Sequence, residues 1–547
     1  MVLAVRQRWG AVVSQSERTI LLSTILLISA ISAVAGFVLV QYYAVDALSS
    51  LVFVPNDCYL EWGMKVGRHC FSDYTVVVSF GMRSNPWEPY PMQLLSGFRL
   101  GQNNYPAAGM VPQMIFGRLG QWLGLPQLGL FGYLCVLTVA VLTPAVWAAR
   151  GARGLERVVV FVACGIVVIP AWMVVDRGNS AGFVVPIALI FLVALSRQRW
   201  VLVTVMVVLA ALVKPQFAVL VVALFAARQW RLGGVGIAGA VLSHIAAYAL
   251  WPRAFPMTIA QSIHGILGYG TFQALVAPTN VSFGKALLAI PDSLKAWHAS
   301  GSIPEGFLAG PRSMIGYAVL VVVVVLVLVL GRRIPPVMVG IVLLATAFLS
   351  PSLSQPYYLV FALPIAALLV RDPDGPPGTG IFDRPAALGG RRRVVSLAVT
   401  VAAAFSIAHI PLPSAPFRVG DLLGQLGPLI DAHAIVVTSV MLAPMLWLVA
   451  CGAIIVSYAR HPAFVSAAVS SGASEREMSV AKIAQHSGGS DDDHLGGNPV
   501  HTQLDKHRQD DQVNGPGSEV DAPEADEVTE HVALNSEHKT PMQHKGK

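Results

Sequence analysis

The sequence predicts an all-α polytopic membrane protein, and two observations carry this prediction. Hydrophobic residues make up 55% of the 547 positions and charged residues 12%, which is more apolar surface than a soluble core of this size could use. Mean hydropathy is accordingly high, at +0.63. About 12 hydrophobic segments follow one another, and the longer ones reach the ~20 residues that a bilayer core requires. They lie at 20–41, 126–149, 158–175, 181–196, 201–213, 216–227, 235–251, 314–331, 336–349, 357–371, 394–412 and 434–457.

Arginine clusters determine the predicted orientation. They precede the first segment and then occupy every second connection, at 150–157, 197–199, 228–231, 332–333 and 391–393. Short cytoplasmic loops carry an excess of lysine and arginine, so both termini are predicted to be cytoplasmic in the inner (plasma) membrane. The large loops 42–125 and 252–313, and the connections 176–180 and 350–356, then lie outside. This arrangement gathers the candidate polar residues onto the extracytoplasmic face.

The two ends of the chain differ from its apolar middle. Residues 1–19 form a basic, polar cytoplasmic N-terminus, and the first apolar segment is too long for the h-region of a cleaved signal peptide, so it is predicted to be a retained span. Residues 461–547 are predicted to be a disordered cytoplasmic tail. From residue 471 this tail holds 15 acidic and 7 basic residues, a net charge of −8. Since the whole chain carries +7, the remainder carries +15, a charge that favours anionic lipid and not nucleic acid as the partner.

The first outer loop collects carboxylates that have no use in a plain membrane anchor. Asp57 follows the first segment closely enough to fold back to the membrane surface, where a carboxylate can act as a general base on a hydroxyl group. Asp46 and Glu61 are candidates for the same role, and Asp73 and Glu88 belong to the same loop. A solvated loop aspartate without catalytic function is the alternative.

Two cysteines of the outer loop could form a disulfide that fixes the loop with these carboxylates. An oxidising exterior permits a disulfide between Cys58 and Cys70, and two free thiols are the alternative. The other three cysteines, Cys135, Cys164 and Cys451, fall within hydrophobic segments.

Two outer turns carry candidate phosphate ligands. Segments 201–213 and 216–227 are too short to cross a bilayer, and they meet at Lys214-Pro215, which predicts a broken helical pair with Lys214 at its outer apex. A cation there is costly without a partner, and a phosphate would supply one, although Lys214 could also reach water by snorkelling. Arg177 lies in the outer turn Asp176-Arg177-Gly178-Asn179, where it could bind phosphate or pair with Asp176.

Three further polar or amphipathic segments lie on the predicted outer side. The turn 350–358 (SPSLSQPYY) opens a helix, where backbone N–H groups can face an anion or a sugar. Asn280-Val281-Ser282 matches a glycosylation sequon, a pattern that is frequent by chance. Residues 108–123 follow Tyr105-Pro106 and are predicted to be an amphipathic helix in the outer membrane interface.

The order of these pieces resembles glycosyltransferase family 87, a family of actinobacterial membrane enzymes of the GT-C class that use polyprenyl-phosphate sugars. The resemblance covers about residues 20–460 and rests on the acidic loop with Asp57, on Tyr105-Pro106, Gly178-Asn179 and Lys214-Pro215, and on the turn before Tyr357-Tyr358. It implies a GT-C-like catalytic domain, with Asp57 as the base and Lys214 as a contact of the donor phosphate. Arg177 is a second phosphate candidate. The residues predicted to bind substrate are Glu61, Tyr105, Asn179, Gln355, Tyr357 and Tyr358.

The same resemblance implies the reaction. We expect an inverting transfer, without metal or cofactor, from a polyprenyl-phosphate sugar to a cell-envelope glycolipid or polysaccharide acceptor on the outer face. Mannosyl is the favoured sugar and arabinofuranosyl the next. This chain departs from many members at Gly178-Asn179, where they have Gly-Gln, and after the Ser-Pro turn, where they have an aromatic residue and histidine, so the donor sugar stays open. A twelve-span lipid or solute transporter, or flippase, is the alternative, although we find neither an internal repeat nor a carboxylate in mid-span. A scaffold without catalytic activity is a third.

Overall fold

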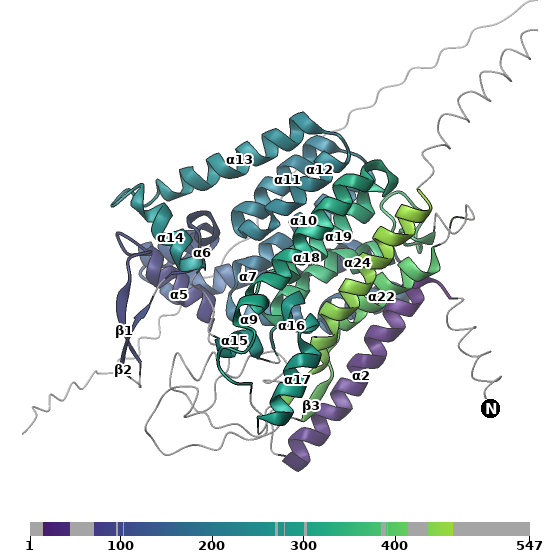
Figure 1. The fold of residues 1–547 in the computed structure, drawn as a ribbon, viewed down its shortest axis with the longest axis horizontal. Helices are drawn as coiled ribbons and strands as arrows, with labels where there is room; N and C mark the ends of the chain where they lie inside the picture. Colours follow the sequence, from purple (N-terminus) through teal and green to yellow (C-terminus); the bar gives the residue numbers. More distant parts are fainter. Residues whose placement is uncertain are drawn as a thin grey trace, which may run out of the picture. The chain divides into compact units, whose positions relative to one another are not determined.

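The computed structural model is built almost entirely of helices (Figure 1). It describes residues 15–43, 71–94, 97–101, 103–267, 272–277, 279–299, 303–383, 390, 392–413 and 436–462. The predicted acidic tail therefore lies outside the described residues apart from positions 461 and 462, and so does most of the N-terminal segment. The described residues support the predicted class, a helical membrane protein.

Helices occupy every one of the predicted hydrophobic segments. In chain order these are α2 (Glu17–Tyr43), α7 (Pro126–Ala149), α8 (Leu155–Phe161) with the π-helix η1 (Val162–Ile166) and α9 (Ile169–Arg177), the 3-10 helix η2 (Ser180–Phe183) with α10 (Val184–Ser196), α11 (Trp200–Val213), η3 (Pro215–Val221) with α12 (Val222–Ala226), α13 (Trp230–Tyr248), α18 (Ala309–Leu330) with η4 (Gly331–Arg333), α19 (Pro336–Leu349), η5 (Pro356–Phe361) with α20 (Ala362–Val370), α22 (Arg393–Ile407), and η6 (Ser439–Leu442) with α24 (Ala443–Arg460).

The number of these helices that cross a membrane is smaller when it is judged by length and composition. Within the described residues, four helical stretches qualify as spans, at Glu17–Leu39, Pro126–Ala149, Ala309–Arg333 and Ser439–Arg460. A fifth forms if Leu155–Ile166 and Ile169–Arg177, which meet at a bend of 49°, are counted as one. The other apolar helices that were tested have 10–17 residues, so the predicted count of twelve crossings stays a prediction.

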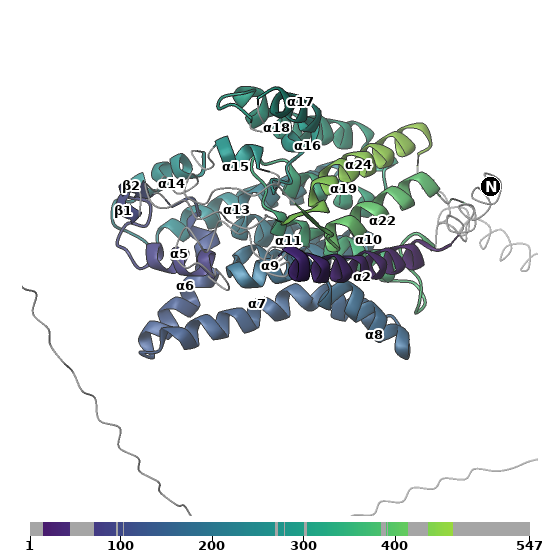
Figure 2. The same ribbon diagram turned by 90° about the horizontal axis from the view of Figure 1, so that it is seen from below.

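The centre of the helical bundle is formed by α10, α19 and α20. Every residue of α20 is buried, and so is α19 from Met338 to Leu349, as expected for helices that are apolar all round and surrounded by others. These helices pack against one another and against α7, α11, α18, α22 and α24, with α2 along α22 (Figure 2). In contrast, α18 buries only Arg312, Gly316, Val323 and Val327, a single stripe, and exposes apolar side chains elsewhere, as suits a helix that faces lipid.

Three breaks in the helical bundle have the same backbone arrangement. In each, a residue with extended backbone precedes a 3-10 helix: Asn179 before η2, Lys214 before η3 and Gln355 before η5. The predicted break at Lys214-Pro215 is thus present, because α11 ends at Val213 and Pro215 opens η3. The 3-10 helices lie close together, since η5 packs against α9, η3 against α19, and both η2 and η5 against α10. The polar residues that open two of these breaks, Asn179 and Lys214, take part in one shared site.

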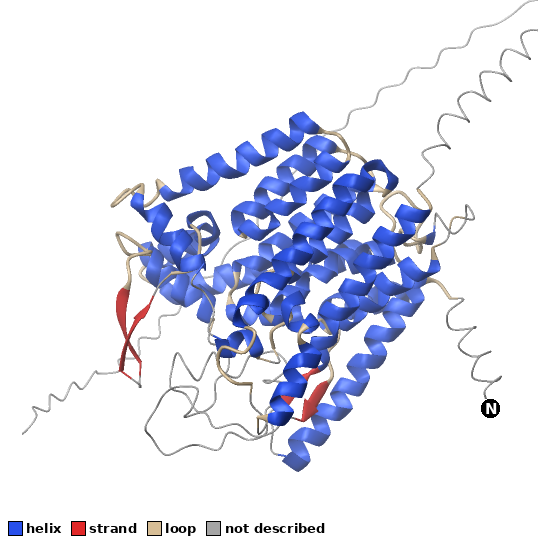
Figure 3. Ribbon diagram, in the orientation of Figure 1, coloured by secondary structure: helices blue, strands red, loops and turns tan. Residues whose placement is uncertain are grey.

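The loop segments add short helices and two small ladders. The loop 42–125 contains α5 (Ser72–Gly81) and α6 (Ala107–Trp122), which occupies the predicted amphipathic stretch. The second contains α14 (Met257–Leu267), α15 (Phe272–Val276), α16 (Phe283–Leu287) and α17 (Ala289–His298). Sequence analysis predicted no strands, but β1 (Tyr90–Leu94) pairs antiparallel with β2 (Gly97–Gly101), and β3 (Pro411–Pro413) with β4 (Val436–Thr438) (Figure 3).

Candidate functional site

A buried polar cluster lies where the loop 42–125 meets the three helix breaks. Its first member, Asp73, lies in the first turn of α5, where a carboxylate is favoured by the partial positive charge of the helix N-terminus. Phe71, which precedes the helix with a positive φ of 48°, donates its backbone N–H to the carbonyl oxygen of Asp176 at 3.1 Å. This bond ties the start of α5 to the end of α9 and so brings Asp73 to the turn that follows α9.

The turn after α9 requires a glycine. Gly178 ends the helix with a φ of 63°, a left-handed conformation that glycine adopts without a steric penalty. A Cβ atom at this position would lie 2.7 Å from the Cβ atom of Tyr74, so any larger residue would push α5 away. The carbonyl oxygen of Gly178 accepts a hydrogen bond from the Tyr133 hydroxyl at 3.0 Å. The glycine thereby places Arg177 and Asn179, on either side of it, against Asp73.

Asp73 is bound by both of these neighbours. Arg177 donates from Nε to Oδ2 of Asp73 at 2.7 Å and from Nη2 to Oδ1 at 3.2 Å, which is a two-point ion pair. The side-chain amide of Asn179 donates to Oδ2 of Asp73 at 2.8 Å, while its carbonyl oxygen accepts from the backbone N–H of Ala181 and so caps η2. Arg177 therefore forms an ion pair with Asp73, a partner that sequence analysis did not consider.

Two predicted tyrosines complete the cluster. The amide nitrogen of Asn179 lies 3.2 Å from the hydroxyl oxygen of Tyr105 and 3.2 Å from that of Tyr357. Tyr105 is held just before α6 by a hydrogen bond from its backbone N–H to Asn103, and Tyr357 lies in η5. The guanidinium of Arg177 lies over the Tyr357 ring, 5.3 Å from its centroid. Four segments distant in sequence therefore meet at one amide group.

Lys214 is the member of the cluster that lacks a hydrogen-bonding partner. Lys214 is only 8% exposed, and its Nζ lies 4.3 Å from the centroid of the Tyr105 ring. Within the described part of the chain, this Nζ makes no hydrogen bond and no ion pair. A cation–π contact supplies only about 2 kcal/mol when desolvated, which is less than the cost of removing an ammonium group from water.

The cluster carries an excess of positive charge. Lys214 and Arg177 contribute two cations, and Asp73 forms an ion pair with Arg177. Burial raises the pKa of Asp73, while the hydrogen bonds from Asn179 and Tyr105 and the charge of Lys214 oppose that rise. A raised pKa makes the negative charge of Asp73 costly to keep. The arrangement is therefore suited to an anionic ligand that would lie against Lys214.

The remaining predicted residues fall into two groups. Tyr358 packs its ring on that of Tyr357, with centroids 4.7 Å apart, and Gln355 caps η5 with a backbone hydrogen bond to Tyr358. Both lie next to the cluster, and no side-chain hydrogen bond of Gln355 is formed with any described residue. The predicted base Asp57, its competitors Asp46 and Glu61, and the cysteines Cys58 and Cys70 lie outside the described residues.

The turn that opens η5 is fixed by Asn280, whose sequon is a structural feature. The Asn280 side chain is 1% exposed, and its amide nitrogen donates to the carbonyl oxygens of Leu275 and Ser352, at 3.0 Å each. Its oxygen accepts from the backbone N–H groups of Ser282 and Ser354. An amide nitrogen that is buried and bonded in this way is not accessible to a glycan, so its role here is to hold the turn before Tyr357.

Sequence analysis missed Asp73 as a site residue, although it belongs to the acidic loop. The signal was local: an aspartate follows Phe71-Ser72 and precedes the apolar run 74–80, which is the pattern of a helix with an acidic first turn.

Within the described residues, no group of three or more His, Cys, Asp or Glu side chains could hold a metal ion.

Comparison of the chain with models of protein families, with curated proteins and with solved structures finds no match. The chemistry of the polar cluster therefore has to be inferred from its own residues.

Proposed function

We propose that this chain is an integral-membrane glycosyltransferase that moves a sugar, mannosyl first and arabinofuranosyl next, from a polyprenyl-phosphate donor to a cell-envelope glycolipid or polysaccharide. The observation that supports it most is Lys214, a buried cation without a hydrogen-bond partner in the described chain, beside Arg177 and Asp73. A phosphodiester bound against Lys214 would neutralise the excess charge and satisfy the ammonium group.

The proposed chemistry places these residues at the leaving group. The acceptor hydroxyl attacks the anomeric carbon, the bond between that carbon and the phosphate oxygen breaks, and polyprenyl phosphate leaves with the bonding electrons. Lys214, with Arg177 beside it, stabilises the charge that develops on the phosphate, and Asp57 takes the proton from the acceptor. Inversion follows from a single displacement. The hydroxyls of Tyr105 and Tyr357 each lie 3.2 Å from the Asn179 amide nitrogen, a group of polar atoms that suits recognition of a sugar.

The membrane arrangement belongs to the same proposal. We place both termini in the cytoplasm, the cluster on the outer face, and all twelve hydrophobic segments in the bilayer, the short ones as broken helices. Arg197, Arg228 and Arg371 follow the helical segments that begin at the cluster, so the arginine-rich ends lie away from it. This is the charge asymmetry expected of cytoplasmic ends.

A transfer assay with the purified full-length protein tests the function. Synthetic short-chain polyprenyl-phosphate mannose and the arabinofuranosyl equivalent are incubated with envelope lipid extract, and release of polyprenyl phosphate is measured together with incorporation of sugar. We expect release and incorporation in equal amounts with one donor. Movement of either donor across a vesicle membrane without release would favour the transporter instead.

The assignment of the base is tested in the same assay. Asp57→Asn preserves shape but cannot take a proton, so transfer is expected to fall by roughly 10²–10⁴-fold. Asp46→Asn and Glu61→Gln serve as matched controls. If Asp57→Asn retains near-normal transfer while one of the control variants loses it, the residue replaced in that control is the base.

A further inference from the structure

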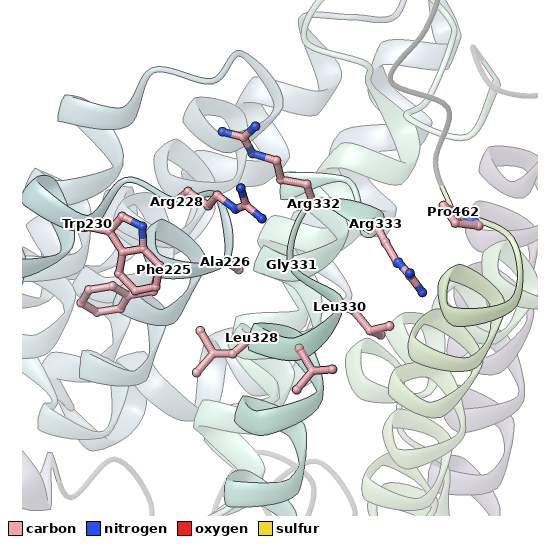
Figure 4. Close-up of a pocket in the computed structure, with 11 residues that line it drawn as sticks. Phe225, Ala226, Arg228, Trp230, Leu328, Leu330, Gly331, Arg332, Arg333 and Pro462 are labelled. Carbon is pink, nitrogen blue, oxygen red and sulfur yellow. The ribbon is translucent and has the colours of Figure 1, made fainter.

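A second site lies at the arginine-rich end of the helical bundle, away from the polar cluster. A cavity of about 660 Å³ opens there between the turn that joins α12 to α13 and the end of α18 (Figure 4). Arg228 and Trp230 come from the turn, and Leu328, Leu330, Arg332 and Arg333 come from α18 and η4. The α12 end that lines this cavity is opposite to the end where η3 begins at Lys214.

The three arginines of the cavity have no acidic partner in the described part of the chain. Elsewhere at this end, arginines that stabilise the fold are paired: Arg197 with Asp374 at 2.8 Å and Arg393 with Glu17 at 2.9 Å. Arg228, Arg332 and Arg333 are exposed and make no ion pair or hydrogen bond with any described residue, and no described aspartate or glutamate lines the cavity. Three cations that line one cavity repel one another, and an anion bound among them would offset this repulsion.

The other wall of the cavity is apolar and continues along a membrane helix. Leu328, Val329 and Leu330 end the α18 stretch that qualifies as a span, and all three line the cavity. Trp230 is 62% exposed, as is typical of tryptophan at a membrane interface. In Figure 4 the leucines lie below the level of the arginines Arg228 and Arg332. Cationic groups above an apolar wall match a ligand that has an anionic head and a hydrocarbon chain.

The backbone also holds one arginine at a strained position. Arg228 has a φ of 60°, in the left-handed region where glycine or asparagine is more usual. The residues that follow Arg228 lead directly into α13. A glycine at this position would adopt the same turn with less backbone strain. An arginine at this position brings its guanidinium group to the rim of the cavity.

We infer that this cavity binds a phosphate-bearing membrane lipid, with the phosphate between Arg228, Arg332 and Arg333 and an acyl chain along Leu328 and Leu330. Two or three guanidinium groups can bind one phosphate through charge-assisted hydrogen bonds, and each basic side chain near an anionic membrane surface contributes about 1 kcal/mol. The inference does not depend on the proposed glycosyl transfer. It assigns a lipid site to the opposite face.

The test measures lipid binding to the purified full-length protein in neutral detergent. Thermal unfolding is recorded with increasing phosphatidylglycerol, with phosphatidylcholine, and with glycerol 3-phosphate, and lipid that stays bound is counted by mass spectrometry. The variant is Arg228→Gln, Arg332→Gln and Arg333→Gln together. The matched control is Arg153→Gln, Arg157→Gln and Arg199→Gln, which removes three exposed arginines outside the cavity.

We expect phosphatidylglycerol to raise Tm in the wild type and in the control, and the cavity variant to bind it at least ~10-fold more weakly. Phosphatidylcholine should have little effect. Equal loss in both variants, or no loss in either, would overturn the inference, because binding would then follow net charge or another surface. If glycerol 3-phosphate alone stabilises the wild type as strongly as the lipid, the site binds free phosphate esters and the assignment to a lipid is wrong. A Leu328→Gln variant separates the two sources further, because it should weaken binding of the lipid only.

Discussion

The described residues hold two buried clusters with the same charged residues, one lysine, one arginine and one aspartate, and they differ in how the charges are satisfied. In the cluster of α16, α17 and α18, Asp292 accepts from both cations, from Lys285 at 2.8 Å and from Arg312 at 3.0 Å and 2.5 Å. In the cluster at the helix breaks, Asp73 binds Arg177 at 2.7 Å, but Lys214 remains without a hydrogen bond in the described chain.

The pKa values of the two aspartates shift in opposite directions. Burial alone would raise the pKa of Asp292, but hydrogen bonds from Arg312 and Lys285 outweigh it and lower the pKa. Burial prevails at Asp73 and raises its pKa. The Asp292 carboxylate therefore binds both cations of its cluster, although Arg312 Nε has no hydrogen-bond partner among the described residues. In the Asp73 cluster, no described residue accepts a hydrogen bond from Lys214 Nζ, and our proposal of a binding site there rests on this difference.

The largest expected effect is on stability, from removal of the structural carboxylate. Asp292→Asn leaves Arg312, which is 1% exposed, buried without its counter-charge, a change that typically costs about 3–5 kcal/mol. We expect a large drop in Tm of the purified protein and rapid proteolysis of the loop 252–313. Asp73→Asn is the matched comparison and should cost clearly less, because burial already disfavours the ionised form. Equal losses would contradict the distinction between the two clusters.

Replacement of the lysines should separate the clusters in function. Lys214→Met keeps length and removes charge, so the proposed donor phosphate would lose its stabilising partner and kcat/KM for the donor should fall by about 10²–10³-fold. Lys214→Arg should keep part of the activity because the charge remains. Lys285→Met is the control and should leave the kinetics nearly unchanged. Equal donor kinetics for wild type and Lys214→Met would remove Lys214 from phosphate binding and leave Arg177 as the next candidate.

Sequence was sufficient for the features that depend on local pattern. Apolar length located the helices, and Pro215 located the break at Lys214, because a proline cannot continue the helical ladder. Five of the predicted residues meet in one cluster: Arg177, Asn179, Lys214, Tyr105 and Tyr357.

The partners within the cluster could not be predicted in the same way. Arg177 and Asp73 lie 104 positions apart, and their pairing depends on the packing of α5 against the end of α9, which no local spacing encodes. Asp176, adjacent in sequence, was the partner considered, but adjacent side chains on a helix point in different directions. The pairing of β3 with β4 was missed for a related reason, since Pro411 pairs with Thr438 and Pro413 with Val436 across a long connection.

A smaller effect is expected from the tyrosines of η5, and it tests which of them belongs to the site. Tyr357→Phe removes the hydroxyl that lies 3.2 Å from the Asn179 amide, and a hydrogen bond of this kind contributes about 0.5–1.5 kcal/mol. Donor kcat/KM should therefore fall by about 2- to 10-fold. Tyr358→Phe retains the ring that packs on Tyr357 and should change kcat/KM less. The reverse order in steady-state kinetics would place the substrate against Tyr358.

The smallest expected effect is a pH dependence of donor binding that belongs to Asp73. Its raised pKa means that Asp73 takes up a proton at a higher pH than a free aspartate does, and protonation removes the negative charge from a cluster with two cations. Donor binding should therefore tighten as pH falls from neutral into mild acid, while the charge of the donor phosphodiester stays constant. One like charge removed near the phosphate is worth on the order of 1 kcal/mol, so binding should tighten by at most about fivefold. The pH dependence is measured as equilibrium donor binding without acceptor, so that protonation of Asp57 does not affect the result.

Asp73→Asn should bind the donor with little pH dependence over this range. A variant that keeps the wild-type pH profile would assign the titration to another group and would leave the charge balance of the cluster independent of Asp73.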